Sequence, residues 1–434
     1  MKKNGIQILT LLIVVIISQI TFAQEMLTLE DAIGIALTEN HNVQVARNNA
    51  EISENNAHIG GAGLLPRLDI VSSANYTDNE IKTQSGTVNE KSTRTSAGIQ
   101  ASYTLFDGLS NIYTYKKLNS LGESGELQAR NLIELSIIEV SNVYFMVAEA
   151  SENLKLVLES LEISRQRLER AQNRSQFGQA NTIEVLSAEV DFNTDSVSYI
   201  NAKLLLNQAK RNLNVLLNRE LDSDFRVSFD VEFLENLNLP ELQNKAIQNN
   251  AAYLLSTKNK QQSEFNLKIA ESSYMPKLDF QTFYGYNQTE NELGITMNDP
   301  KRNFTAGLSL NFNLFNGFQN SVNRQNAQIQ LKNEQILQEE ALLNLQSDVK
   351  NNYQAYQNSL YVLKVQQKNL QPAQLNFNRT KELYELGQVT TTQFREAQLN
   401  LIRAKNNILS AKYDAKINEI QLRRLSGSLL ETNS

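Results

Sequence analysis

The sequence predicts a mixed α and β chain, built as a tandem repeat of one unit: a strand pair followed by a long helical hairpin. Two observations support this fold class. Short motifs recur at a nearly constant offset, and between them the hydrophobic pattern changes from a strand period to long helical stretches. The motif pairs, about 210 positions apart, are Leu65–Asp69 with Met275–Asp279, Thr104–Gly108 with Asn313–Gly317, and Gln176–Gln179 with Glu385–Gln388. A period this long indicates two copies of a large unit and not a short-repeat solenoid.

The repeat predicts the order of segments along the chain. We expect a signal peptide over 1–23, a first repeat over 24–220, a linker over 221–239, a second repeat over 240–428 and a tail over 429–434. The predicted strands are about 66–77, 94–106, 276–287 and 303–315, with polar loops at Thr77–Thr93 and Asn287–Asn303. The predicted long helices are 109–177 and 318–386, and the return helices are 181–219 and 390–426. Each repeat opens with one further helix, Leu27 to about Ala57 and Glu241 to about Ser272.

The N-terminus has the three parts of a secretory signal. Lys2 and Lys3 precede an apolar run from Ile6 to Ile20, and Thr21-Phe22-Ala23 predicts cleavage before Gln24. A retained membrane anchor is the alternative. No later run reaches the roughly 18 apolar residues of a membrane helix. A mature chain that spans a membrane must therefore use strands.

The predicted strands alternate between an apolar and a polar face. Phe304, Leu308 and Leu310 alternate with Thr305 and Ser309. Each segment has about ten residues, which suits a tilted membrane strand with its polar face toward water. A soluble hairpin with one face on a core shows the same alternation, so the pattern does not separate the two. Four strands cannot close a barrel around a lumen, so the membrane interpretation requires several chains.

The long helices are each roughly 70 residues, which at about 1.5 Å per residue is on the order of 100 Å. Gly178 and Gly387 end them, and helix resumes within a few residues, which predicts a tight hairpin at each glycine. Pro372 is expected to kink the second long helix, either as a hinge or as a passive bend. The return helices show the heptad spacing of a coiled-coil seam. Its apolar positions are Ile183, Leu186, Val190, Val197, Ile200 and Leu204 in the first copy, and Leu399, Ile402, Leu409, Tyr413 and Ile420 in the second.

The composition excludes several classes of function. The chain has no cysteine, which excludes disulfides, thiolate nucleophiles, Cys-based zinc sites and an N-terminal lipid anchor. The net charge of −6 disfavours a nucleic-acid partner, which needs a basic surface. With two histidines and no glycine-rich phosphate loop, the sequence predicts a protein that is not an enzyme and binds no cofactor or metal.

Together these features resemble the TolC-type outer-membrane efflux protein family over nearly the whole mature chain. The resemblance lies in the paired strands, the Leu-Phe-Asp/Asn-Gly exits at Leu105–Gly108 and Leu314–Gly317, and the two glycine tips followed by Ser187-Ala188 and Glu396-Ala397. It implies a homotrimer whose twelve strands form one β-barrel in outer-membrane lipid, continued by a periplasmic α-helical coiled-coil barrel. It also implies two partners, a periplasmic membrane-fusion adaptor protein and an inner-membrane transporter.

The resemblance implies two sites. The adaptor would dock at the hairpin tips, on Phe177, Gly178, Gln179, Leu386, Gly387 and Gln388. A periplasmic gate or selectivity ring would lie six and nine places after Gly387, at Gln393 and Glu396. Gln393 is not acidic, so a doubled acidic ring needs its second charge from Glu184, six places after Gly178. The alternative is that both glutamates are ordinary solvated helix residues.

The function expected from this resemblance is the outer-membrane exit channel of a tripartite export system that carries small molecules such as drugs, toxic compounds or metals. A type I secretion conduit for proteins or peptides is an alternative. A soluble periplasmic coiled-coil scaffold is an alternative of another class, but it leaves the four alternating strands without a role. The sequence does not indicate the cargo.

Overall fold

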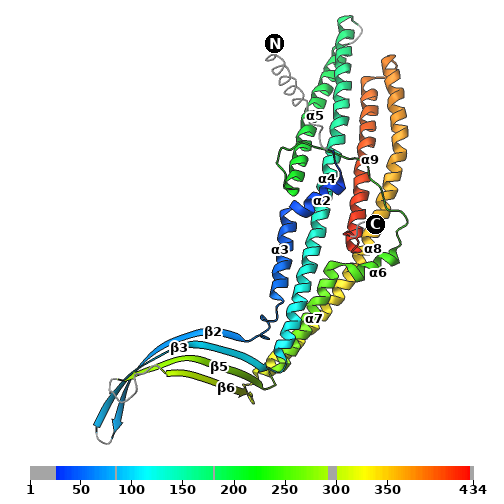
Figure 1. Ribbon diagram of the computed structural model, residues 1–434. Coiled ribbons are helices and arrows are strands. Elements are labelled where there is room, and N and C mark those ends of the chain that lie inside the picture. The colour runs from blue at the N-terminus through cyan, green and yellow to red at the C-terminus, as the bar shows by residue number, and fades with distance from the viewer. Residues whose placement is uncertain (1–25, 84–85, 179–180, 292–300, 431–434) are drawn as a thin grey trace, which may run out of the picture. The chain divides into compact units, whose positions relative to one another are not determined.

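The computed structural model describes residues 26–83, 86–178, 181–291 and 301–430, so the predicted signal peptide lies outside the described residues. The chain divides into two compact units, which Figure 1 shows as ribbons. The first comprises the chain up to Ala46, Asn131–Asn250 and the chain from Leu345. The second comprises Arg47–Arg130 and Ala251–Asn344. Each unit takes matching segments from both sequence repeats.

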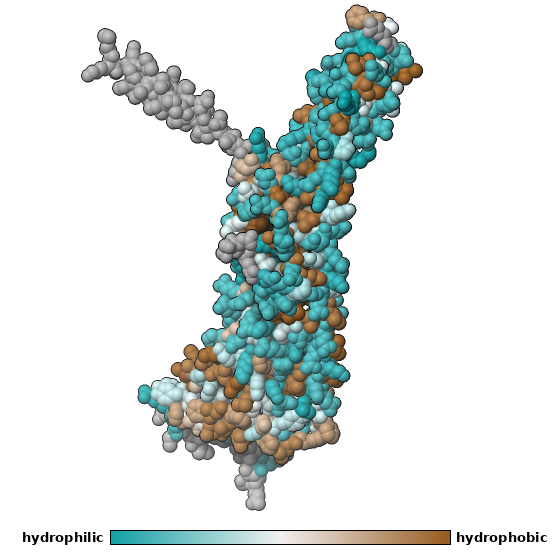
Figure 2. Space-filling view, turned by 90° about the vertical axis from the view of Figure 1, so that its right-hand side faces the viewer, coloured by the Kyte–Doolittle hydropathy of each residue, from teal (hydrophilic) through white to brown (hydrophobic). Residues whose placement is uncertain are grey.

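The second unit contains an antiparallel sheet of four strands in the order β2-β3-β5-β6. Its strands are β2 (Arg67–Thr83), β3 (Gly86–Phe106), β5 (Lys277–Asn291) and β6 (Lys301–Asn311). One apolar row crosses all four strands because Ile70 pairs with Ile99, Ile99 with Tyr284, and Tyr284 with Phe304. These side chains are exposed, and hydrophobic residues gather over the strand region in Figure 2, whereas the helices are mainly hydrophilic.

The strand lengths differ from the prediction in three places, one of which is the predicted polar loop Asn287–Asn303, because β5 runs to Asn291 and β6 begins at Lys301. The polar segment Thr77–Thr93 is not a loop, because β2 runs to Thr83 and β3 begins at Gly86. Its polar residues pair across the hairpin, as in Asp78 with Lys91, so the backbone ladder continues regardless of side-chain polarity. The last predicted strand stops at Asn311 and not at 315, because the partner strand β5 begins opposite it at Lys277.

Two glycines face each other across β3 and β5. A Cβ atom on Gly98 would lie 2.6 Å from the Phe283 ring, and one on Gly285 would lie 2.4 Å from the Ala97 carbonyl oxygen. Any side chain at either position would displace the ring or the neighbouring strand. Glycine is therefore required here for the close approach of two strands and one aromatic ring.

Four helices of the second unit pack in the order α3, α4, α7, α8. They are α3 (His41–Asn56), α4 (Ser110–Gln176), α7 (Ala251–Ser272) and α8 (Gln319–Glu385). Gly125 of α4 lies against Ser53 of α3, Ser124 of α4 accepts a hydrogen bond from Gln262 of α7, and Gln338 of α8 donates one to Thr257 of α7. The two edges of this helical layer are α3 and α8.

The two long helices begin in the same way. Asp107 Oδ2 accepts a hydrogen bond from the Asn111 N–H (2.9 Å), and Asn316 Oδ1 accepts one from the Asn320 N–H (3.4 Å). The Asn111 amide then donates to the Gly63 carbonyl, as the Asn320 amide does to the Ser273 carbonyl. Asp107 and Asn316, which directly follow the predicted strands, thus each cap the N-terminus of a long helix.

The first unit contains α2 (Leu29–Glu39), α5 (Thr182–Leu216), α6 (Leu239–Asn249), α9 (Thr391–Leu425) and the remaining parts of α4 and α8. Strands β1 (Met26–Leu27) and β4 (Arg226–Val227) pair in parallel. Buried Tyr144 of α4 joins them, because its hydroxyl accepts from the Ser228 N–H (3.0 Å) and donates to the Leu27 carbonyl oxygen (2.9 Å). This contact anchors the linker between the repeats to the helical core.

Each repeat opens with two helices and not with the single helix predicted. The breaks fall at Asn40 and Asn250, where the backbone is extended. The buried Asn40 side chain accepts from the Val43 N–H (3.2 Å) and donates to the Leu216 carbonyl oxygen (2.8 Å). Asn250 donates in the same way to the Leu425 carbonyl oxygen (3.1 Å). Each asparagine therefore ends one helix and also satisfies the last carbonyl group of a return helix.

The two return helices use their heptad positions differently. On α5, Ile183, Leu186, Val190, Val197, Ile200 and Leu204 are all exposed, with exposed fractions between 52% and 74%. We call these six residues the α5 stripe. On α9, Tyr413 and Ile420 are buried in the core of the first unit. The predicted seam is thus filled within the chain at two positions of the second repeat, while Leu399 is exposed, and it is left open in the first repeat.

The long helices are continuous. Pro372 lies inside α8, which runs without interruption from Gln319 to Glu385. Among the described helices, α4 alone contains an 18-residue stretch apolar enough to cross a membrane by length and composition. More than half of that stretch, 56%, is buried inside the chain, as in the core helix of a packed bundle.

Replacing Asn40 with alanine is expected to lower the free energy of unfolding by about 1–3 kcal/mol, because the change leaves buried backbone groups without partners. Asn42→Ala is the control, since that side chain is exposed. Urea unfolding of the purified protein in detergent, followed by circular dichroism, measures both. Equal stability of the two variants would show that the Asn40 contacts contribute nothing.

Candidate functional site

The hairpin tips are built on glycines with positive φ angles. Gly178 has φ +67° and Gly387 has φ +74°. At the second tip the Gly387 N–H donates to the Tyr384 carbonyl (3.0 Å) and the Gln388 N–H to the Leu383 carbonyl (2.9 Å). This is a Schellman ending, which satisfies the last carbonyl groups of α8 and turns the chain toward α9.

Large apolar side chains are exposed at both tips. Phe177 is 79% exposed and Leu386 is 70% exposed. Gln388 and both tip glycines are exposed as well, whereas Gln179 lies outside the described residues. Each tip thus presents one large apolar side chain to its surroundings. Five of the six predicted docking residues therefore lie on a surface that a partner can reach.

The three gate candidates have different surroundings. Glu184 forms an ion pair with Arg174 across the first hairpin, with an N–O distance of 3.0 Å. The Gln393 side chain accepts hydrogen bonds from the Thr390 N–H (2.9 Å) and hydroxyl (3.1 Å), and so caps α9. Glu396 is exposed on α9. Of the two acidic candidates, Glu396 is therefore the more available to face a neighbouring chain or a lumen.

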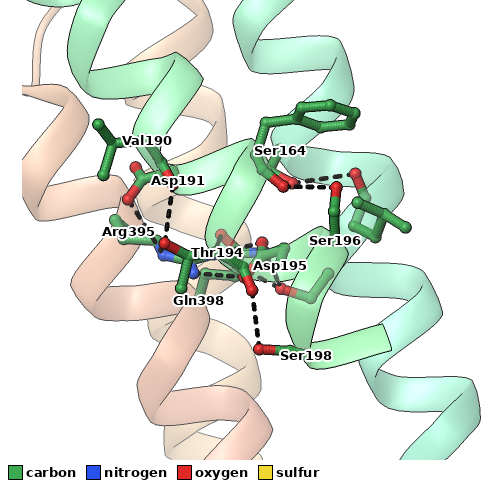
Figure 3. A network of polar contacts seen from close by, with 12 residues as sticks. Ser164, Val190, Asp191, Thr194, Asp195, Ser196, Ser198, Arg395 and Gln398 are labelled. Carbon is green, nitrogen blue, oxygen red and sulfur yellow. Dashed lines mark hydrogen bonds and ion pairs between the residues drawn. The ribbon is translucent and has the colours of Figure 1, made fainter. Parts of the chain in front are cut away.

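A buried network of charged and polar side chains lies beyond the tips, between α4, α5 and α9. Arg395 of α9 points toward Asp191 and Asp195 of α5 (Figure 3). Its guanidinium binds both oxygens of Asp195, with N–O distances of 2.8 and 2.6 Å. The Arg395 and Asp195 side chains are only 14% and 7% exposed. This two-pronged geometry is the strongest form of arginine–carboxylate contact.

The remaining members of the network complete its hydrogen bonds. Ser160 of α4 donates to Asp195 (3.0 Å), and the Gln398 amide of α9 donates to Ser160 (3.1 Å). Burial lowers the pKa of Arg395, but the hydrogen bond and charge of Asp195 outweigh it, so this pKa lies above its ordinary value. Arg395 is therefore charged in the folded chain. A buried charge of this kind is stable only while its partners are present.

Further contacts continue the same seam between the two hairpins. Arg167 of α4 binds Asp191 of α5 at 2.9 Å, next to the Phe394 ring of α9. Lys405 of α9 pairs with Glu159 of α4 at 3.2 Å. Nearer the tips, Arg170 of α4 donates to the Glu385 carbonyl of α8 (2.9 Å). The first hairpin (α4 and α5) thus contacts the second (α8 and α9) at several levels.

The sequence did not reveal this network. Asp191 and Asp195 lie four residues apart on α5, a spacing that places them on one helix face. That spacing shows a charged face but does not identify its partner, which lies 200 residues away in Arg395. The two acids do not stand out in the sequence, because α5 carries other polar residues such as Glu189 and Asn193.

Replacing Asp195 with alanine is expected to lower the free energy of unfolding by about 3–5 kcal/mol, because the change leaves the Arg395 charge buried without its main partner. Lys405→Ala is the matched control, since its partner Glu159 is 55% exposed and the ion pair is expected to contribute less than about 1 kcal/mol. Thermal or urea unfolding in detergent compares them. A loss for Asp195→Ala no larger than for Lys405→Ala would contradict the assigned importance of the network.

Comparison with protein families gives one match that covers most of the chain. The model for "Outer membrane efflux protein" matches twice, at residues 32–219 and 242–428. The two matches correspond to the two sequence repeats.

Individual relatives are distant but align over most of their length. The outer membrane protein TolC of Vibrio cholerae is 24% identical, over 85% of this chain and 84% of its own. The probable outer membrane lipoprotein SilC of Salmonella typhimurium is 22% identical, over 90% of this chain and 83% of its own. Among solved structures, the CmeC outer membrane channel of Campylobacter jejuni superposes with a TM-score of 0.81 at 17% identity, over 94% of this chain and 87% of its own.

Proposed function

The chain belongs to the outer membrane efflux protein family, and we propose that it is the exit channel of a tripartite export system for small molecules. In this role it receives cargo from an inner-membrane transporter through a periplasmic adaptor protein and releases it outside the cell. The observation that carries the proposal is the exposed apolar row Ile70, Ile99, Tyr284 and Phe304 across the whole sheet. An apolar face of this extent is stable in lipid and unfavourable in water.

The assembly that fits this sheet is a homotrimer. In the described chain β2 pairs only with β3, and β6 only with β5, so both outer edges of the sheet can accept a neighbouring strand. Three chains joined edge to edge would close twelve strands into one barrel, which leaves no unpaired backbone in lipid. In such a ring, β6 of one chain pairs with β2 of the next, which is a heterologous association that closes on itself.

The helices offer surfaces for the same association. On α8, Val322, Ile329, Ile336 and Leu343 are exposed and follow one another at intervals of seven residues. On the other edge of the layer, α3 exposes Ile52, and the α5 stripe is exposed in the first unit. Apolar residues at heptad spacing are typical of helix–helix seams. We infer that a second copy of the chain covers these faces and that the helices form a periplasmic coiled-coil barrel.

The gate candidates fit this assembly as rings near the tips. Three copies would place three Glu396 side chains at one level and, at another, three Glu184 side chains whose charge is balanced by Arg174. Rings of carboxylates favour cations over anions in a pore. Gln393 contributes no charge, and its capping contacts hold the start of α9.

The purified mature protein is expected to fractionate with the outer membrane and, in planar lipid bilayers, to conduct ions with a preference for cations. Reversal potentials in a salt gradient measure that preference. Heat-denatured wild-type protein serves as the unfolded control. Recovery of the wild-type protein in the soluble periplasm, or bilayers without conductance, would exclude the channel function.

Gly178→Arg and Gly387→Arg are expected to abolish export while leaving trimer yield unchanged. Both glycines have positive φ and open space around them, so the new side chain would point into the surface where the adaptor docks. Gly317→Arg is the matched control, because Gly317 also has a positive φ and open space but lies between β6 and α8 and not at a tip. Growth of a deletion strain of the source bacterium with an exported toxic compound measures export. Normal export by both tip variants would show that the tips are not the docking surface.

A further inference from the structure

We propose that a hollow on the polar face of the sheet, beside the Phe283 ring, is a binding site for uncharged, planar aromatic molecules that pass through the channel. This inference rests on the proposed channel function, because it names a class of cargo and the part of the barrel wall that contacts it. It concerns strand residues, which include neither the tips nor the gate candidates.

The polar face of the sheet carries one aromatic side chain. One row of paired residues on this face consists of Asp69, Gln100, Phe283 and Thr305. The row lies opposite the exposed apolar row, since successive residues of a strand point to opposite faces. Among the described strand residues on this face, Phe283 is the only aromatic one. In the proposed barrel the polar face lines the water-filled lumen, so the ring is directed toward passing cargo.

Two glycines hold the Phe283 ring against the sheet. A Cβ atom on Gly98 would lie 2.6 Å from the Cζ atom of the ring, and one on Gly285 would lie 2.7 Å from the same atom. The ring therefore lies over both glycines, where any other residue would displace it. Phe283 is half-buried, so part of the ring packs on the backbone and part stays accessible. A ring fixed in this way loses little further conformational freedom when a ligand stacks on it.

A hollow of about 400 Å³ opens beside the ring, over β3, β5 and β6. Six of its lining residues belong to the polar face: Gln100, Gln281, Phe283, Thr305, Gly307 and Ser309. A Cβ atom on Gly307 would have nothing within 4 Å, so the absence of a side chain there keeps the space open. The hollow also shows that the polar face is concave at this point, as the inner wall of a barrel must be.

The chemistry of the hollow fits an uncharged aromatic ring with polar substituents. Phe283 supplies a surface on which a second ring can stack. Gln100 and Gln281 supply amide groups that both donate and accept, and within the described chain neither amide group has a hydrogen-bond partner. The lining residues include no charged side chain, so an ion would lose hydration without gaining a counter-charge. A pocket of a few hundred Å³ with one apolar surface and a few polar groups is typical of a small-molecule site.

Tryptophan fluorescence tests the binding directly. The chain contains no tryptophan, so Phe283→Trp places a single one at the hollow. We expect 4-nitrobenzamide, an uncharged aromatic amide, to quench its fluorescence in the purified full-length protein along a saturable curve, with half-saturation at about 1 mM or below.

Two further variants serve as controls for this measurement. Asn75→Trp lies on the same polar face outside the hollow, so its quenching should rise in proportion to concentration without saturation. Gly307→Leu added to Phe283→Trp fills the hollow and should abolish saturation. Quenching that follows the same unsaturated course in all three proteins would overturn the proposal.

Saturation-transfer NMR tests the same site with Phe283 in place, and so does not depend on the folding of a tryptophan variant. Transfer from the wild-type protein to 4-nitrobenzamide should fall about threefold or more in Gly307→Leu, because the second ring can no longer stack. The anion 4-nitrobenzoate, which has nearly the same shape, should receive less transfer than the amide from the wild-type protein. Equal transfer to 4-nitrobenzamide from both proteins, or equal transfer to the amide and the anion, would overturn the proposal.

These measurements separate the binding site from the proposed function, because neither needs a conducting channel. Bilayers in which the wild-type protein never conducts would count against the channel, whatever the binding. Normal conductance without saturable binding of 4-nitrobenzamide would leave the channel function in place and would overturn the site at Phe283.

Discussion

The edge strands β2 and β6 impose the constraint on which the rest of the structure depends. In the described residues each pairs with one neighbour only, so one side of each strand has backbone groups directed away from the sheet. Lipid offers no hydrogen bonds to such groups, and a membrane sheet is stable only when it closes. The four strands of one chain are too few for that closure. The proposed trimer meets this constraint, and in it the exposed apolar faces of the helices become contacts between copies.

The chain combines two kinds of interaction. Inside the chain a hydrophobic core joins the helices, and buried polar contacts fix how its segments align: Arg395 with Asp195, Asn40 with the Leu216 carbonyl, and Tyr144 with Ser228. The surfaces left exposed, such as the α5 stripe and the heptad positions of α8, are apolar. Polar contacts set one register within the chain, and apolar faces supply the driving force for association.

The predicted fold class and family are confirmed. They could be predicted because the motifs that mark turns and helix ends occur once in each repeat. Glycines at 178 and 387 have positive φ as the tip motif predicts. The strand lengths could not be predicted, because Asp78 and Lys91 are polar residues that remain in a strand through pairing with each other. The helix breaks at Asn40 and Asn250 were missed although both recur at the repeat offset, since their partners are carbonyl groups of distant helices. The role of Arg395 was missed because its partner, the Asp195 carboxylate, lies 200 positions away in the sequence.

The unequal use of the two return helices has a consequence for symmetry. A chain of half this length could build a ring of identical hairpins, but every return helix would then present the same face to its neighbours. Here α9 directs Tyr413 and Ile420 into its own chain, while α5 exposes its stripe. In the proposed assembly both hairpins contribute to the core of their own chain, and the hairpin with the α5 stripe supplies the contact with a neighbour. A ring of such chains alternates between two kinds of seam, and a ligand that docks around its tips would meet two distinct sites per chain.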